Sequence, residues 1–252
     1  MVFGLWSALF WTAFFLIAIW WLSRQLAFFF MSALYLLTRS EQFSVATYAI
    51  FFLPGTVVHE FAHWFVANLL GVKTAGFNVL PKVGKKGSIQ LGSVSIRGGN
   101  LITHTLIGMA PMLLGGVLTV WLSYVLVNVS AMHDAVQAQS LRSIAVYLWQ
   151  VFQHQDAFVL LYLLFTISGS MFLSASDRAP ILQMFLYLAL VLTPLYFLGM
   201  MPAVPGSLTG RISEVFSVFA SGLAVAVLVH LAITALMGGI YLLVRLAVPV
   251  RQ

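Results

Sequence analysis

The sequence predicts an all-α polytopic membrane protein with about six transmembrane helices and a small β-hairpin between the second and third helices. Composition gives the first reason, because 62% of the 252 residues are hydrophobic and only 7% are charged. A soluble domain has roughly 25% charged residues, and a disordered chain has low hydrophobicity and high charge. The second reason is that the apolar residues form long runs, and a bilayer is crossed by about 20 of them in a helix.

The apolar runs divide the chain into spans of a single membrane-embedded domain, residues 1–252. Its parts are an N-terminal span at 2–37, a core at about 45–180 and C-terminal spans at 181–248. We expect the individual spans at 2–22 (or as far as 37), 45–70, 101–127, 158–173, 181–201 and 212–248. Pro54-Gly55 predicts a kink in the second span. The last span is longer than one crossing requires, so it is expected either to tilt or to break near Gly238-Gly239.

Two connections carry structure of their own. Residues 72–100 contain a Gly/Lys turn followed by alternating apolar residues whose phase shifts near Gly92, which predicts a β-hairpin with a bulge there. Leu141, Ile144, Leu148 and Phe152 recur at helical spacing, so part of 129–156 is expected to form a helix at the membrane interface.

Lys and Arg residues predict the orientation. With six spans, one side carries eight of them and the other three or four, depending on Arg24. The positive-inside rule then predicts that both termini are cytoplasmic, and the protein is expected in the cell membrane. The expected partner is the lipid bilayer and not nucleic acid, because the net charge of +6 is spread thinly among apolar segments.

The second span carries the sequence His59-Glu60-Phe61-Ala62-His63. His59 and His63 are one helical turn apart, so both imidazoles can bind one zinc ion. Glu60 can act as general base on a water molecule that the metal activates. Ionisable groups inside a membrane are costly and usually functional, which favours a metal site over a chance match.

A catalytic zinc ion needs a third protein ligand. The candidates are Asp177, Glu214, His104, His230, Asp134, His154 and Asp156. Asp177 is expected at the cytoplasmic end of the bundle, near His63, whereas Glu214 is expected on the opposite side. The alternative role for Asp177 is a helix N-cap, with Pro180 in the first turn.

Together these residues resemble the site-2 protease family of intramembrane zinc metalloproteases, in a short form without a PDZ domain. Besides the His-Glu-x-x-His motif, Gly108–Pro111 resembles the small-residue segment of the family, and 168–177 resembles the segment that delivers its third ligand. Arg178 follows Asp177 where the family has glycine. The resemblance, which covers about 45–180, implies one zinc ion per chain held by His59, His63 and Asp177. It also implies Glu60 as catalytic residue, hairpin 72–100 in substrate binding, and a single-span membrane protein as substrate.

Three other functions remain open. Glu214 as third ligand would resemble the CAAX-type membrane proteases. A divalent metal transporter would need further polar sites along a pathway, and the second span offers only Asn68 after His63. The last is an inactive membrane scaffold.

Overall fold

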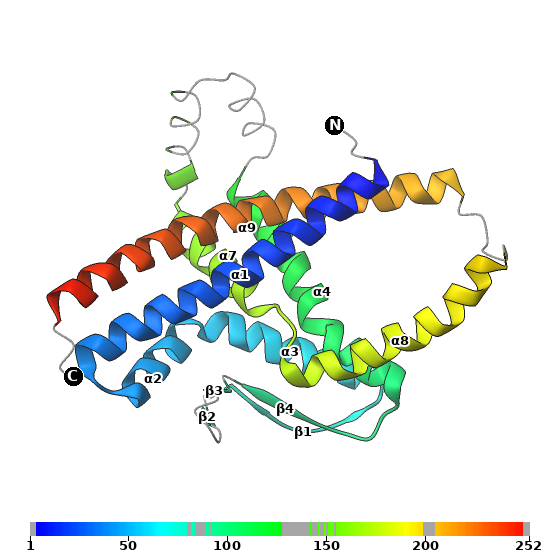
Figure 1. The fold of residues 1–252 in the computed structure, drawn as a ribbon, viewed down its shortest axis with the longest axis horizontal. Helices are drawn as coiled ribbons and strands as arrows, with labels where there is room; N and C mark the ends of the chain where they lie inside the picture. Colours follow the sequence, from blue (N-terminus) through cyan, green and yellow to red (C-terminus); the bar gives the residue numbers. More distant parts are fainter. Residues whose placement is uncertain are drawn as a thin grey trace.

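The computed structural model describes residues 4–79, 82–83, 89–90, 92–127, 142, 146, 149, 151–153, 155–198 and 205–248. The described elements are mainly helices (Figure 1). In chain order they are α1 (Leu5–Thr38), α2 (Glu41–Phe51), α3 (Leu53–Leu69), β1 (Lys73–Asn78), β2 (Lys82–Val83), β3 (Ile89–Gln90), β4 (Ser93–Arg97), α4 (Leu101–Leu126), α7 (Ala157–Ser170), α8 (Ala175–Phe197) and α9 (Gly206–Ala247).

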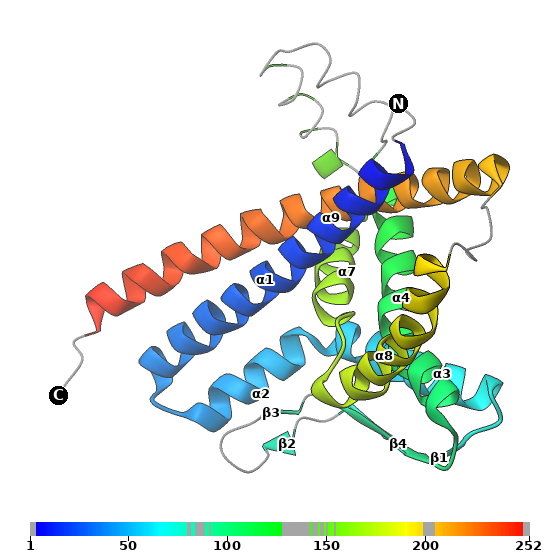
Figure 2. The same ribbon diagram turned by 45° about the vertical axis from the view of Figure 1, so that its right-hand side comes forward.

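The helices form one bundle with α4 in its middle. The long helices α1 and α9 run side by side in both ribbon views (Figures 1 and 2). α4 contacts α3, α7, α8 and α9. The main core lies where α1, α4, α7 and α9 meet, and it includes the fully buried Ile19, Leu164 and Leu223.

Apolar side chains cover much of the outer surface as well, including Trp6, at 83% exposure. An apolar outer surface of this extent is typical of a protein that lies in lipid.

Four helices, α1, α4, α8 and α9, are long and apolar enough to cross a membrane, and α2 with α3 makes a fifth if counted as one span. A helical protein with several apolar spans is therefore confirmed. The count of about six is not, because α7 has only 14 residues.

α2 and α3 are separated by a bend of 69° at Phe52. Pro54 lies in the first turn of α3, where its missing N–H costs no helical hydrogen bond. The predicted kink at Pro54-Gly55 is thus confirmed, and the break falls just before it.

The predicted start of the fifth span was wrong. α8 begins at Ala175 and not at 181, because Ser174 and Asp177 form a capping box that starts the helix earlier. Of the two alternatives expected for the last span, the break is absent, because α9 continues unbroken through Gly238-Gly239. At Gly238 an added Cβ would lie 3.3 Å from the Phe29 ring, so this glycine lets α1 approach α9 closely.

The predicted hairpin is present as two antiparallel pairs, β1 with β4 and β2 with β3. The register shift in the β1–β4 pair lies between Thr74 and Phe77. Gly92 precedes β4, and the bulge predicted near it stays a prediction, because residue 91 lies outside the described residues. The interfacial helix predicted within 129–156 lies largely outside the described residues.

Candidate metal centre

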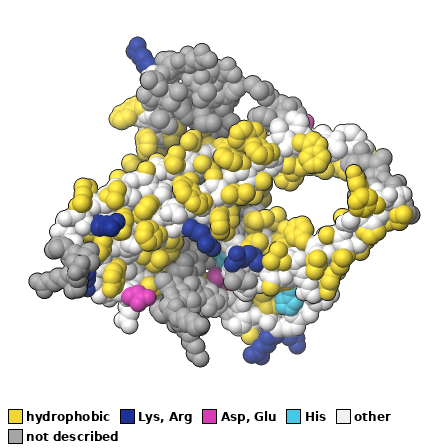
Figure 3. Space-filling view, viewed as in Figure 1, with side chains coloured by type: hydrophobic (Ala, Val, Ile, Leu, Met, Phe, Trp, Pro, Cys, Tyr) yellow, Lys and Arg dark blue, Asp and Glu magenta, His cyan; other side chains and the backbone are white. Residues whose placement is uncertain are grey.

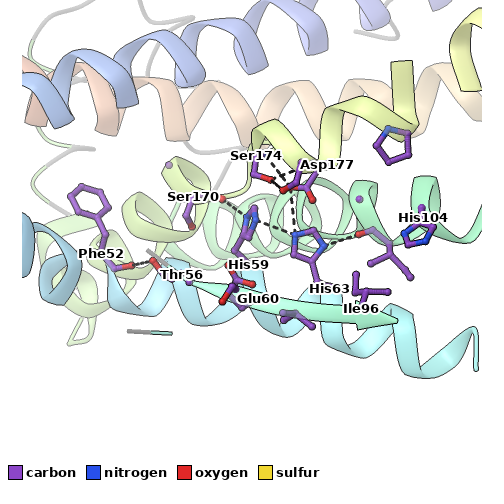
Figure 4. Close-up of a pocket in the computed structure, with 18 of the residues that line it drawn as sticks. Phe52, Thr56, His59, Glu60, His63, Ile96, His104, Ser170, Ser174 and Asp177 are labelled. Atoms are coloured by element: carbon purple, nitrogen blue, oxygen red, sulfur yellow. Dashed lines mark hydrogen bonds and ion pairs between the residues drawn. The ribbon is translucent and has the colours of Figure 1, made fainter. Parts of the chain in front are cut away.

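The two histidines of α3 are held with one ring nitrogen of each facing the other (Figure 4). Their Nε2 atoms lie 3.3 Å apart. The Nδ1 atom of His59 is 2.7 Å from the carbonyl oxygen of Ser170 at the end of α7, and the Nδ1 atom of His63 is 2.9 Å from that of Ile107 in α4. Each histidine is therefore oriented by a backbone carbonyl of a different helix.

The two carbonyl groups decide the tautomer of the imidazoles. A carbonyl oxygen only accepts hydrogen bonds, so each Nδ1 must carry the hydrogen, and each neutral ring then has a lone pair on Nε2. Two lone pairs that face each other at 3.3 Å repel unless a cation or a proton lies between them. Metal-binding histidines are typically held this way, with the second nitrogen donating to a carbonyl or carboxylate.

Asp177 approaches this pair from the first turn of α8. Its Oδ2 atom lies 3.6 Å from His63 Nε2 and accepts a hydrogen bond of 2.8 Å from the Ser174 backbone N–H. The Ser174 hydroxyl in turn accepts from the Asp177 N–H, at 3.3 Å. Asp177 is thus the third helical residue and not the N-cap, which is Ser174. The alternative role of N-cap was therefore wrong, since Asp177 closes the capping box from the third position while its Oδ2 atom lies beside His63.

Gly108 of α4 lets α8 come this close. A Cβ at this position would lie 3.1 Å from the Asp177 carbonyl oxygen. The adjacent residue, Ile107, is the one whose carbonyl orients His63. The Gly108–Pro111 segment therefore positions both a candidate histidine ligand and the candidate carboxylate ligand.

The geometry of the three side chains fits a metal ion. Ligand atoms about 2.0–2.1 Å from a tetrahedral zinc ion lie roughly 3.3–3.4 Å from one another. The observed separations of 3.3 and 3.6 Å are close to that, and all three ligand atoms lie within 4.8 Å. Within the described part of the chain, His59, His63 and Asp177 are the one group of three side chains that could hold a metal ion. Two nitrogens and one carboxylate suit zinc and leave a fourth position open.

Glu60 lies in the same cavity, which has a volume of about 670 Å³. Its side chain is only 7% exposed. The backbone of Gly92, just before β4, covers it so closely that a Cβ on Gly92 would lie 2.7 Å from Glu60 Cγ and 2.8 Å from Oε1. Ser93, Val94 and Ile96 of β4 also line the cavity. The hairpin therefore forms a wall of the site.

The other candidate ligands lie elsewhere. His104 lines the cavity but does not belong to the metal-binding group. His230 is fully buried in α9, where Nδ1 donates to the Ala226 carbonyl at 3.0 Å. Glu214 and Asp156 are neither in the group nor in the cavity wall. Asp134 and His154 lie outside the described residues.

Sequence reasoning missed the groups that orient the motif. The carbonyls of Ser170 and Ile107 are backbone atoms, which no side-chain pattern reveals. The sequence associated Gly92 only with a bulge and Gly55 only with a kink, although both allow close contacts at the site. An added Cβ at Gly55 would collide with the Thr166 carbonyl and the Ser170 hydroxyl.

Comparisons with models of known families, with curated proteins and with solved structures give no match to this chain.

Proposed function

We propose that the protein is an intramembrane zinc metalloendopeptidase of the site-2 protease type. The observation that carries the proposal is the pair of facing Nε2 atoms of His59 and His63, 3.3 Å apart, with the Asp177 carboxylate beside them. A buried arrangement of this kind is electrostatically costly without a cation. It is also placed on a helix within an apolar chain, where such groups are usually functional.

The proposed chemistry divides between the metal and Glu60. Zinc, when bound by His59, His63 and Asp177, supplies a Lewis acid that activates water and polarises a carbonyl group. The Glu60 carboxylate follows His59 in sequence and lines the same cavity. It takes the proton from the attacking water and passes it to the amine of the leaving peptide.

The substrate is proposed to be a membrane protein, of which a single-span protein is the simplest case. A peptide bond inside a helix is hydrogen-bonded and sterically covered, so the substrate has to unwind at the cleavage site. β4 pairs only with β1 among the described strands, and its residues line the cavity. The unwound segment can therefore add to the free edge of β4, where backbone hydrogen bonds hold it regardless of its side chains.

The membrane arrangement follows from the positive residues and the bend between α2 and α3. The C-terminus is proposed to be cytoplasmic, on the side of the hairpin and the site. The N-terminus is proposed to lie on the other side, because α1 and α9 run parallel, with Thr12 beside Phe216 and Phe29 beside Gly238. α2 and α3 then form a re-entrant pair, which differs from the expectation that both termini are cytoplasmic. A reporter at each terminus tests this arrangement.

Glu214 as third ligand receives no support, because it is absent from the group and from the cavity wall. A transporter also receives none, because the described residues hold one group of three candidate metal ligands and no second such group along a pathway.

Quantitative mass spectrometry of membrane fractions tests the proposed activity. Cells that express the wild type are compared with cells that express Glu60→Gln at the same level. New peptide ends within membrane spans, present with the wild type and absent with the variant, are expected. Identical peptide ends in both cells would refute the proposed activity in that host. An inactive membrane scaffold would then be the function to test.

A further inference from the structure

The hairpin segment carries an unbalanced positive charge. Residues 72–100 contain five of the twelve Lys and Arg residues and no Asp or Glu. Lys73 and Arg97 are exposed and directly opposite each other in the β1–β4 pair. Figure 3 shows Lys and Arg side chains gathered at the lower edge of the molecule, in the region of this pair.

Two like charges opposite each other across a pair of strands repel, because their Cβ atoms are only about 4.5–5.5 Å apart. The ion pair identified among the described residues is that of His63 with Asp177, so no acidic side chain there compensates Lys73 or Arg97. A pair of this kind is stabilised when an anion bridges the two cations.

The pair faces away from the helices. Ile96, next to Arg97 on β4, packs against a small core that includes Ala67 and Ile107 of α3 and α4. Neighbouring residues of a strand point to opposite faces, so Arg97 and its partner Lys73 point outward. An anion that binds them therefore comes from outside the bundle.

Exposed apolar side chains come shortly before Lys73 in the chain. Leu69 and Leu70, at the end of α3, are 69% and 37% exposed. Cations next to exposed apolar groups are typical of a surface that sits at the boundary between lipid headgroups and acyl chains. A soluble anion would need the cations but not these apolar neighbours.

We propose that Lys73 and Arg97 form a binding site for the phosphate groups of anionic lipids. The proposal rests on the membrane location given under the proposed function. Bound lipid fixes the end of β4 that carries Arg97, while the other end leads into Gly92, which covers Glu60. Anionic lipid thereby holds the strand in the position that closes the wall of the cavity and presents its free edge.

Hydrogen exchange in vesicles tests the lipid site without any need for turnover. The protein is reconstituted in phosphatidylcholine alone and in phosphatidylcholine with phosphatidylglycerol, and flotation first verifies that it is inserted. Amide exchange in 73–78 and 93–97 is expected to slow at least about threefold with phosphatidylglycerol. The effect is expected to disappear in Lys73→Gln/Arg97→Gln and to persist in the matched control Arg211→Gln/Arg245→Gln, which removes the same charge from α9.

The outcomes separate the lipid proposal from the proposed function. Equal exchange of the inserted wild type in both lipids overturns the lipid site and leaves the protease proposal standing. Protection by inorganic phosphate in phosphatidylcholine vesicles, or by an acidic peptide alone, overturns it in favour of a soluble anion or a substrate segment. Protein that does not float with the vesicles refutes the membrane location, on which both proposals depend.

Discussion

His59 and His63 face each other through Nε2 atoms 3.3 Å apart, and each is fixed from behind by a carbonyl of a different helix. Because α7 holds His59 and α4 holds His63, the pair is set by tertiary packing and not by the spacing in α3 alone. Asp177, from α8, completes the arrangement. Four helices thus converge on one point, so changes in how these helices pack are expected to alter the site.

Glu60→Gln is expected to retain about one zinc ion per chain and to lose proteolysis by at least about 100-fold. The amide has nearly the same shape as the carboxylate but cannot take a proton from water. Zinc content and cleavage of a substrate found by the mass-spectrometric comparison are measured on the same preparation. Glu214→Gln is the control and is expected to keep both, since Glu214 lies outside the cavity wall. Full cleavage by Glu60→Gln would remove Glu60 from the chemistry.

Gly92→Ala is expected to lower kcat by roughly tenfold or more while zinc stays bound. The added Cβ would lie 2.7 Å from Glu60 Cγ, so either the carboxylate or the hairpin has to move. Steady-state kinetics and zinc content check this. Gly239→Ala, where a Cβ meets nothing within 4 Å, is the matched control. Equal loss in both variants would mean that the contact with Glu60 is unimportant.

Gly55→Ala is expected to destabilise the protein by about 1–3 kcal/mol and to weaken zinc binding. The new methyl group would collide with the Thr166 carbonyl, which can move only if α7 moves. α7 also ends in the Ser170 carbonyl that orients His59. Thermal unfolding in detergent and zinc titration check both effects. Gly210→Ala, in open space, should leave zinc affinity unchanged and raise helix stability slightly. An unchanged melting temperature in Gly55→Ala would contradict the close packing of α3 on α7.

A reporter fused after the C-terminus is expected to show a cytoplasmic location. The reason is that the hairpin, Arg178 and Arg245 place most positive charge on the side of the site. Alkaline phosphatase and green fluorescent protein fusions give opposite signals on the two sides of a bacterial membrane. High phosphatase activity at the C-terminus would contradict the proposed orientation.

The sequence was sufficient for features that depend on composition and local spacing. Long apolar runs predicted the helices, Pro54 predicted the bend, and the turn in 72–100 predicted the hairpin. Features set by tertiary contacts were missed. Gly238 reads as a helix breaker but serves the contact between α1 and α9. α8 also starts earlier than predicted. The side chains of Ser174 and Asp177 each accept a hydrogen bond from the other's backbone N–H, and this reciprocal cap sets the start of the helix.

The same division holds for the site. The motif in α3 identified His59, Glu60 and His63 because their spacing is local. Asp177 lies more than a hundred residues away, and only topology and resemblance made it a candidate. The carbonyls of Ser170 and Ile107 were beyond prediction, because any residue type offers a carbonyl and only the packing decides which one meets an imidazole.

The most direct test of the central claim is the zinc content of detergent-purified protein, compared between the wild type and Asp177→Ala. About one zinc ion per chain is expected in the wild type, and zinc is expected to be lost or bound much more weakly in the variant. Asp177→Asn, which keeps a hydrogen-bond acceptor for the Ser174 N–H, separates loss of the ligand charge from loss of the helix cap. Full zinc in both variants, or none in the wild type, would contradict the metal centre proposed here.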